Sequence, residues 1–274
     1  MGEASSDPYA LTSVFNPTGT NPIPAYSNRV GKTKVDCTIT EAKTGVVVVF
    51  GQSIGANNTN DSYVVTNTNG VQDFSNLDGG CYLAAYPSIG PSFVGNGGPT
   101  YGSYMLRLGD LWINGSNFTR VIFANASIGS SAVADWATGV LGRNITAAFK
   151  RLSDAKLTPT AVIWQQGEND CQAATLQSTY SANLAKVISN IRLHYPTGPI
   201  FINQESWIDG TACLAITTAQ SNAVNHASGI WAGADLDSIT STGRQADNTH
   251  LNAAGAASAA NWLQTAMHAY GAPF

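Results

Sequence analysis

The sequence predicts an α/β fold, a three-layer α/β/α sandwich around a central, mainly parallel sheet. Strands that are covered on both faces read as short continuous apolar runs, and such runs occur at 46–50, 121–125, 161–164 and 200–204. Apolar residues at helical spacing mark the stretches 101–112, 141–157, 176–191 and 251–267. Strand and helix therefore alternate, which favours right-handed crossovers with helices on both faces of the sheet.

One domain accounts for most of the chain. Its 274 residues, 43% of them hydrophobic, suffice for one sizeable α/β domain or at most two small ones. Residues 1–44 are rich in Pro, Asn, Ser and Thr without clear periodicity, and we expect them to form an arm packed on the domain at 45–274. Residues 55–100 contain several glycines and prolines and are expected to form an irregular insertion that shapes one wall of a cleft.

The composition excludes several classes of partner. Charged residues make up only 11% of the chain, and the net charge is −4. With 13 Lys and Arg in total and no basic run, nucleic acid is not an expected partner. No apolar stretch approaches the length of a membrane span. Abundant Asn, Thr, Ser and Gly are typical of exported proteins that handle sugars.

Four cysteines, an even number, fit two disulfides formed in an oxidising compartment. Three pairings are open. We favour Cys171 with Cys213, because both follow strand exits on the same edge of the sheet, which leaves Cys37 with Cys81. Four buried free thiols are the alternative.

The chain is expected to belong to a secreted or periplasmic protein of bacterial origin. Its first residues lack the basic start and apolar core of a signal peptide, so we expect the sequence to begin after one. Six Asn-x-Ser/Thr sequons occur, at Asn57, Asn60, Asn114, Asn117, Asn125 and Asn144. We expect them to be unmodified, because glycans there would obstruct the candidate site that is described next.

A candidate nucleophile follows the first apolar run. The segment Gly51-Gln52-Ser53-Ile54-Gly55 stands at the carboxyl edge of the expected sheet, where open α/β folds place their ligands. The glycines allow a tight turn and the close approach of a substrate to the backbone. Ser53 is therefore a candidate nucleophile; the alternative is an ordinary strand-to-loop turn.

A candidate base stands near the other end of the chain. A serine is a weak nucleophile until a base takes its proton, and Asp247 precedes His250 at a spacing that lets the carboxylate orient the imidazole. For the other histidines, surface or packing roles are expected. His194 and His226 fall in helical runs, and His268 lies near the C-terminus.

Two further strand exits offer donors for an oxyanion. After the run that begins at Ala161, Asn169 supplies a side-chain amide and Gly167 leaves room for a substrate. After the run that ends at Asn125, the small residues around Gly129 present backbone N–H groups. Each segment alone is weak evidence, because glycine turns follow strands in any parallel α/β protein.

Taken together, these segments resemble the SGNH (GDSL-like) hydrolases, within them the branch of carbohydrate O-acetylesterases that includes sialate O-acetylesterases and some acetyl xylan esterases. The resemblance spans about residues 46–268. It rests on four ordered blocks: Gly51-Gln52-Ser53, Gly129 with Ser130, Ser131 and Trp136, Gly167-Glu168-Asn169-Asp170 after Gln165-Gln166, and Asp247 through Leu251. Ile54 departs from the branch, which usually has asparagine after the serine.

The resemblance implies a flavodoxin-like sandwich with about five strands in the sheet and two-step acyl transfer. Ser53 would be the nucleophile, His250 the base and Asp247 its orienting acid. The backbone N–H groups of Ser53 and Gly129 and the side chain of Asn169 would form the oxyanion hole. No metal and no organic cofactor is implied. The implied substrate is an acetylated carbohydrate, with xylan the first choice.

Substrate-binding candidates lie beside these residues. Gln52, Gln166, Glu168 and Trp136 are the residues we expect to contact the substrate. Trp207 and Tyr101 are further candidates for an aromatic platform under a sugar ring, with packing in the interior as the alternative for each aromatic.

Three rival interpretations stay open. Gly51 to Gly55 also fits Gly-x-Ser-x-Gly, the nucleophile elbow of α/β-hydrolases, although an elbow normally follows several strands and its acid and histidine come from separate loops. A general short-chain or aryl esterase would use the same residues on other substrates. A non-catalytic carbohydrate-binding protein on a hydrolase scaffold is the alternative from another class, and the intact set of Ser53, Asn169, Asp247 and His250 argues against it.

Overall fold

The computed structural model describes residues 31–40, 42–91 and 101–274. Most of the expected N-terminal arm and the glycine-rich end of the expected insertion lie outside the described residues. Among the helices that are described, none combines the length and apolarity needed to cross a membrane.

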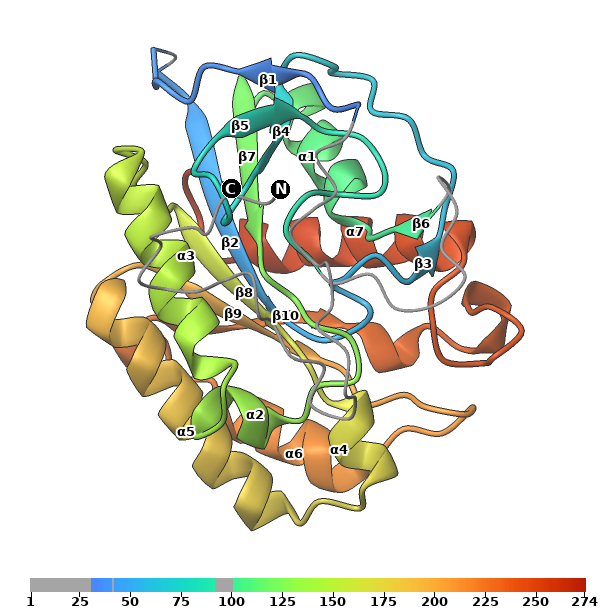
Figure 1. The fold of residues 1–274 in the computed structure, drawn as a ribbon. Coiled ribbons are helices and arrows are strands. Elements are labelled where there is room, and N and C mark those ends of the chain that lie inside the picture. Colours follow the sequence, from blue (N-terminus) through green and yellow to red (C-terminus); the bar gives the residue numbers. More distant parts are fainter. Residues whose placement is uncertain (1–30, 41, 92–100) are drawn as a thin grey trace, which may run out of the picture.

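The centre of the described structure is an eight-stranded sheet in the order β1-β5-β4-β7-β2-β8-β9-β10. Neighbouring strands from β4 to β10 in this order are parallel, while β5 and β1 are added antiparallel at one edge (Figure 1). The bounds are β1 Lys34–Val35, β2 Thr44–Gly51, β4 Val71–Phe74, β5 Cys81–Leu83, β7 Arg120–Asn125, β8 Ala161–Gln165, β9 Ile200–Gln204 and β10 Ile230–Asp235. The three-layer sandwich is confirmed, but the sheet is larger than the five strands expected.

Helices cover both faces of this sheet (Figure 1). One face packs against α2 Val133–Ala137, α3 Gly142–Asp154, α5 Gln177–His194 and α6 Leu214–Ala223. The other face packs against α1 Met105–Asn114 and α7 Ala253–His268. The remaining elements are short: α4 Glu168–Gln172, the pair β3 Thr59–Asn60 and β6 Tyr101–Gly102, and the 3-10 turns η2 His226–Ser228, η3 Leu236–Ser238 and η4 Ser241–Gly243.

Strand β2 lies at the middle of the sheet because its side chains are apolar on both faces. Val46, Val48 and Phe50 belong to the core under α2, α3, α5 and α6, whereas Val47 and Val49 belong to the core under α1 and α7. All five are fully buried. The next strands of the sheet along the chain, β4, β5 and β7, lie on one side of β2, and the later strands β8, β9 and β10 lie on the other side. The strand order therefore reverses at β2. Open α/β folds bind ligands at such a switch point.

The structure differs from expectation in the segment 55–100, which is not wholly irregular. Its short strands β4 (4 residues) and β5 (3 residues) extend the sheet, but they are too short to show an apolar run. Strand β10, with the sequence Ile-Trp-Ala-Gly-Ala-Asp, was not predicted, because the small residues Ala, Gly and Ala do not form a strongly apolar run. His226 lies in η2 and not in a longer helix, because α6 ends at Ala223.

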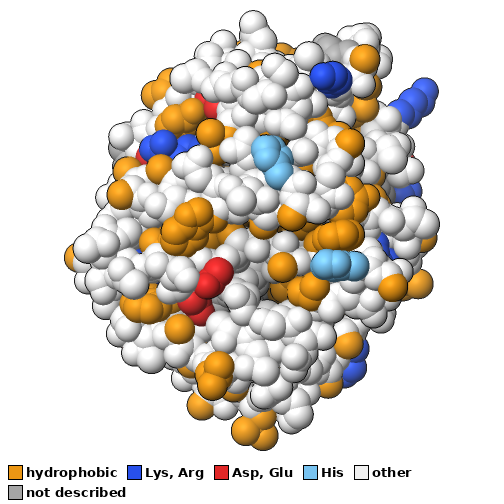
Figure 2. All heavy atoms as spheres, turned by 180° about the vertical axis from the view of Figure 1, so that it is seen from behind, with side chains coloured by type: hydrophobic (Ala, Val, Ile, Leu, Met, Phe, Trp, Pro, Cys, Tyr) orange, Lys and Arg blue, Asp and Glu red, His pale blue; other side chains and the backbone are white. Residues whose placement is uncertain are grey.

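The cysteines form two disulfides, Cys37–Cys81 and Cys171–Cys213, the pairing favoured from the sequence. The surface carries few charges, and Figure 2 shows them scattered among polar and apolar groups on one face of the molecule. Three of the sequon asparagines, Asn57, Asn125 and Asn144, are buried.

Candidate active site

Ser53 follows directly from the central strand. Gly51, the last residue of β2, has φ +139°, and a Cβ there would lie 1.7 Å from the carbonyl oxygen of Gln165 on the neighbouring strand, so only glycine fits. The chain then turns, with the N–H groups of Gly55 and Ala56 donating to the carbonyl oxygen of Gln52 at 3.1 and 3.0 Å. Ser53 is 6% exposed, and no described residue hydrogen-bonds its hydroxyl group.

The segment Asp247–His250 forms a turn that is closed by its own carboxylate. Oδ1 of Asp247 accepts from the backbone N–H groups of Thr249 and His250 at 2.9 and 3.0 Å. Oδ2 lies 2.7 Å from Nδ1 of His250. Partial burial raises the pKa of Asp247, but the hydrogen bonds from His250 and the backbone outweigh it and hold the pKa below its usual value. The carboxylate thus stays ionised beside the imidazole.

This turn is fastened to the segment that follows Ser53. The N–H of Asn60 donates to the carbonyl oxygen of Leu251 at 3.1 Å. Nε2 of Gln245 donates to the carbonyl oxygen of Asn58 at 2.7 Å. The buried guanidinium of Arg244 donates to the carbonyl oxygen of Thr249, next to His250, at 2.6 Å. Two segments far apart in sequence are thereby brought together at the carboxyl edge of β2.

Asn169 lies on α4, just after the exit of β8. The chain can approach the β9 exit closely only because residue 167 is glycine, since a Cβ there would lie 1.6 Å from the carbonyl oxygen of Glu205. The backbone N–H of Asn169 donates to Oε1 of Gln52 at 3.1 Å. No described residue bonds the side-chain amide of Asn169, which is partly exposed.

Gly129 lies in the loop after β7, which is also bound to the exit of β2. The N–H of Ile128 donates to the carbonyl oxygen of Gly51 at 2.9 Å. The hydroxyl of Ser131 donates to the carbonyl oxygen of Ile128 at 2.8 Å and accepts from Nε1 of Trp136 at 2.9 Å. The loop around Gly129 is therefore held at the strand exit that carries Ser53.

Gln166 connects these three loops. Its fully buried side-chain nitrogen lies 3.0 Å from Oε1 of Gln52, 3.1 Å from the carbonyl oxygen of Ser131 and 2.6 Å from Oδ2 of Asp170. Asp170 in turn accepts from the N–H of Val133 at the start of α2, at 2.8 Å. The sequence did not single out Asp170 for this task, although it stands in the same motif as Asn169.

The four residues expected to contact the substrate are all buried. Gln166 and Trp136 are fully buried, Glu168 is 1% exposed and Gln52 is 3% exposed. Trp136 packs edge-on against Phe50 and lies among other core residues. The amides of Gln52 and Gln166 bond other parts of the protein. Gln52 and Gln166 thus help to hold the loops in place, and contact of the four residues with a substrate stays a prediction.

Glu168 and Glu205, the residue after β9, are close enough to affect each other's charge, and no described residue forms a hydrogen bond to either buried carboxyl group. Burial raises the pKa of both, and the neighbouring Glu168 charge raises that of Glu205 further. Both carboxyl groups are therefore harder to ionise than exposed glutamates. No group of three or more His, Cys, Asp and Glu in the described part of the chain is arranged to hold a metal ion.

The loop 206–213 after β9 also contacts the candidate site, which the sequence did not indicate. Nε1 of its half-buried Trp207 donates to the carbonyl oxygen of Asn248 at 3.0 Å, within the turn that carries His250. The position of Trp207 after an apolar run suggested an aromatic platform for a sugar ring, but nothing in the sequence indicated its contact with Asn248.

A serine, a histidine paired with a carboxylate and a side-chain amide that no described residue bonds thus lie at one edge of a three-layer α/β/α sandwich, the arrangement of an SGNH-type hydrolase. The profile of the family described as carbohydrate esterase, sialic acid-specific acetylesterase, matches residues 103–269. The chain belongs to this family, which makes it a carboxylic ester hydrolase by membership. The matched range includes Gly129, Asn169, Asp247 and His250, and Ser53 precedes it.

Comparison with solved structures supports the same fold. A protein from Arabidopsis thaliana superposes with a TM-score of 0.60 at 15% identity, over 83% of this chain and 98% of that one. A carbohydrate esterase family 3 protein from Talaromyces cellulolyticus superposes with a TM-score of 0.51 at 12% identity, over 82% of this chain and 97% of that one. No curated protein sequence matches the chain.

Proposed function

We propose that the protein is a serine esterase that removes acetyl groups from a carbohydrate by two-step acyl transfer. The observation that carries this proposal is the 2.7 Å contact between Asp247 and His250 on a turn fastened to the segment after Ser53. The family membership supports ester hydrolysis, and its description supports an O-acetylated sugar as the substrate.

In the proposed first step, Oγ of Ser53 attacks the ester carbonyl carbon while Nε2 of His250 takes the hydroxyl proton. Asp247 holds Nδ1 of the imidazole, so that Nε2 is left to act as the base. The carbonyl oxygen becomes an oxyanion, which the N–H groups of Ser53 and Gly129 and the amide of Asn169 would receive. The bond to the sugar oxygen then breaks, and that oxygen takes the proton from His250.

In the second step, water attacks the acetyl-enzyme and gives a proton to His250. The new tetrahedral species collapses, acetate leaves, and Oγ of Ser53 recovers its proton from His250. Ser53 is only 6% exposed, which suits a small acyl group better than a long one. The two disulfides support export to an oxidising compartment, and we place the enzyme in the secreted or periplasmic fraction.

The test is hydrolysis of 4-nitrophenyl acetate by the wild type and by Ser53→Ala, followed by acetate release from acetylated xylan and from O-acetylated sialic acid. We expect turnover by the wild type only, and release from at least one of the carbohydrates. Equal rates in both proteins would remove Ser53 from the mechanism. Turnover of aryl esters without release from either carbohydrate would favour a general short-chain or aryl esterase. No turnover of any ester would favour the binding-protein alternative.

A further inference from the structure

The disulfide Cys171–Cys213 joins the helix that carries Asn169 to the loop 206–213. Cys171 lies on α4, a helix of 5 residues that is too short to be stable by itself. Cys213 is the residue immediately before α6 and the last of the loop 206–213. The position of Asn169 thus depends on the end of this loop, and α4 and α6 lie side by side in Figure 1.

The same loop contacts the turn that carries His250. Besides the indole bond of Trp207 to the carbonyl oxygen of Asn248, the N–H of Asp209 donates to the hydroxyl of Thr249 at 2.9 Å. The N–H of Gly210 donates to the carbonyl oxygen of Asn248 at 3.1 Å. These contacts fall on the residues between Asp247 and His250.

Internal contacts fix the shape of the loop. The hydroxyl of Ser206 donates to Oδ2 of the buried Asp237 at 2.6 Å and accepts from the N–H of Cys213 at 2.8 Å, so that the two ends of the loop are joined. The guanidinium of Arg244 lies 5.5 Å from the centre of the Trp207 ring and also bonds the carbonyl oxygen of Thr249. The loop therefore holds its shape between α4 and the histidine turn.

From these contacts we propose that the loop 206–213 is a brace that sets the spacing between Asn169 and His250, with the Cys171–Cys213 disulfide as its fixed end. Cys171, Cys213 and Trp207 are positioning residues, which act through Asn169 and His250 and do not touch the reacting atoms. The proposal rests on the proposed function, because it presupposes that Asn169 and His250 act on one substrate.

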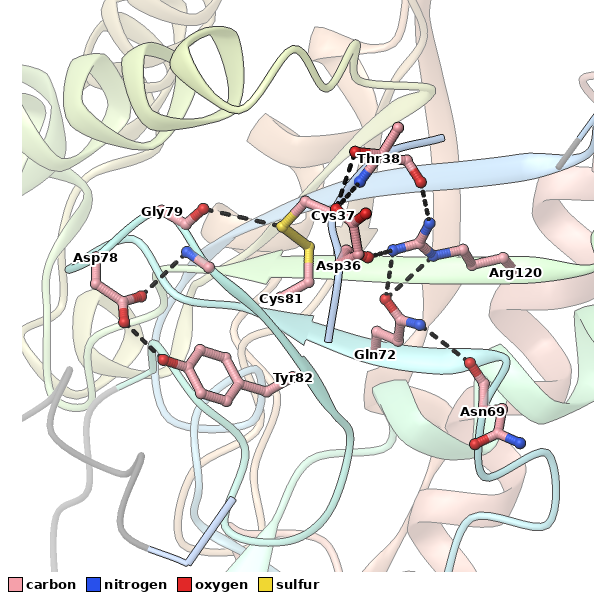
Figure 3. Close-up of a disulfide and its surroundings, with 11 residues drawn as sticks. Asp36, Cys37, Thr38, Asn69, Gln72, Asp78, Gly79, Cys81, Tyr82 and Arg120 are labelled. Carbon is pink, nitrogen blue, oxygen red and sulfur yellow. Dashed lines mark hydrogen bonds between the residues drawn. A yellow bond between two sulfur atoms is a disulfide. The ribbon is translucent and has the colours of Figure 1, made fainter. Parts of the chain in front are cut away.

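The second disulfide provides a matched control. Cys37 and Cys81 are separated by 44 residues, and Cys171 and Cys213 by 42, so the two bridges constrain the unfolded chain almost equally. Strand β5, which carries Cys81, is separated from β2 by β4 and β7. Figure 3 shows that Arg120 also holds the segment around Cys37, through hydrogen bonds to the carbonyl oxygens of Asp36 and Thr38.

The experiment compares kcat and KM for 4-nitrophenyl acetate in the wild type, Cys171→Ala/Cys213→Ala and Cys37→Ala/Cys81→Ala, with the urea midpoint of each. Both double variants should lose stability. Only Cys171→Ala/Cys213→Ala should lose kcat, by about tenfold to a hundredfold with KM nearly unchanged, because misplaced groups fail in the transition state. Equal kcat values in the two double variants would overturn the proposal.

Trp207→Phe keeps the experiment decisive if a double variant fails to fold. This substitution keeps an aromatic ring near Arg244 but replaces the indole by a smaller phenyl ring, and it removes the N–H that bonds Asn248. We expect a severalfold loss of kcat with unchanged KM, and an unchanged kcat would count against the brace. Ser53→Ala distinguishes failure of the proposed function from failure of the brace proposal. If Ser53→Ala retains wild-type turnover, the proposed function is wrong. If Ser53→Ala loses turnover but the brace variants keep a normal kcat, only the brace proposal is wrong.

Discussion

At the residue scale, the carboxylate of Asp247 performs two tasks. One oxygen closes the turn through two backbone N–H groups, and the other orients the imidazole of His250. Asn in place of Asp247 can keep the turn contacts through its single oxygen, and it then presents an N–H₂ group to Nδ1. The charge that stabilises the imidazolium during proton transfer is then lost.

We therefore predict that Asp247→Asn folds normally and loses kcat by about a hundredfold to ten-thousandfold. The measurement is steady-state hydrolysis of 4-nitrophenyl acetate, with the surface substitution Asp154→Asn as the control. A variant with wild-type turnover would make Asp247 a bystander and favour a Ser-His dyad.

Asn169 is the second residue whose role can be isolated. Its side-chain amide is bonded by no described residue, so its removal should disturb little of the fold. We predict that Asn169→Ala lowers kcat by at least about a hundredfold, the usual effect of losing one oxyanion donor, with KM and the melting temperature close to wild type. Asn261→Ala, on the exposed side of α7, is the control. A drop confined to KM would show that Asn169 binds substrate and does not receive the oxyanion.

The segments that the structure brings to one edge of the sheet could be predicted from their motifs, but the exposure of their side chains could not. Ser53, Asp247 and His250 stand in short blocks whose order carries the signal. Gln166 and Trp136 stand in the same blocks and are buried, because burial depends on which loops pack above them. The short sequence blocks do not indicate how these loops pack against one another.

At the scale of elements, the exit of β2 depends on a glycine that no other residue can replace. Gly51 combines a φ of +139° with a Cβ position 1.7 Å from the carbonyl oxygen of Gln165. Gly79 also has a positive φ, +67°, but no atom lies within 4 Å of its Cβ position. Comparing substitutions at the two glycines therefore distinguishes the cost of a positive φ from the cost of a clash with β8.

We predict that Gly79→Ala costs about 1 kcal/mol of unfolding free energy, the effect of left-handed backbone alone. Gly51→Ala should cost several times as much, because the clash forces β2 away from β8, and the remaining folded protein should lose esterase activity with the displacement of Ser53. Urea unfolding and the hydrolysis assay measure both effects. Equal losses of unfolding free energy in the two variants would mean that the end of β2 can shift away from β8 without further loss of stability.

Long apolar strands and periodic helices were predictable, whereas short strands were not. The runs that became β2, β7, β8 and β9 are continuous and apolar, as burial on two faces requires. Strands β4, β5 and β10 acquire their conformation from pairing with neighbours, so a local pattern does not reveal them.

At the scale of the whole molecule, buried acids make stability depend on pH. Asp73 on β4 is 1% exposed and accepts one hydrogen bond, from the N–H of Ile89 at 3.2 Å. Burial raises its pKa to about 7, against the opposing effects of the Lys32 charge and the Ile89 bond. The folded protein therefore binds a proton here that the unfolded chain releases near pH ~4.

From this difference between the folded and unfolded pKa of Asp73 we predict that the free energy of unfolding falls as pH rises from about 4 to about 7. Asp73 contributes up to about 1.4 kcal/mol per pH unit to this fall, and its contribution levels off above the folded pKa. Asp73→Asn keeps an oxygen for the Ile89 N–H and does not ionise, so its slope should be smaller. The pair Glu168 and Glu205, with raised pKa values of its own, contributes in the same direction in both proteins. Urea titrations across this range measure the slopes, and identical slopes would exclude Asp73 as their source.

The central claim is that His250 activates Ser53 as a nucleophile, and covalent labelling tests it most directly. The protein would be treated with diethyl 4-nitrophenyl phosphate, and the modified peptide identified by mass spectrometry in the wild type, Ser53→Ala and His250→Ala. We expect one diethylphosphoryl group on Ser53 in the wild type, none in Ser53→Ala and greatly slowed labelling in His250→Ala. Labelling of another residue, or equal rates in all three proteins, would contradict the claim.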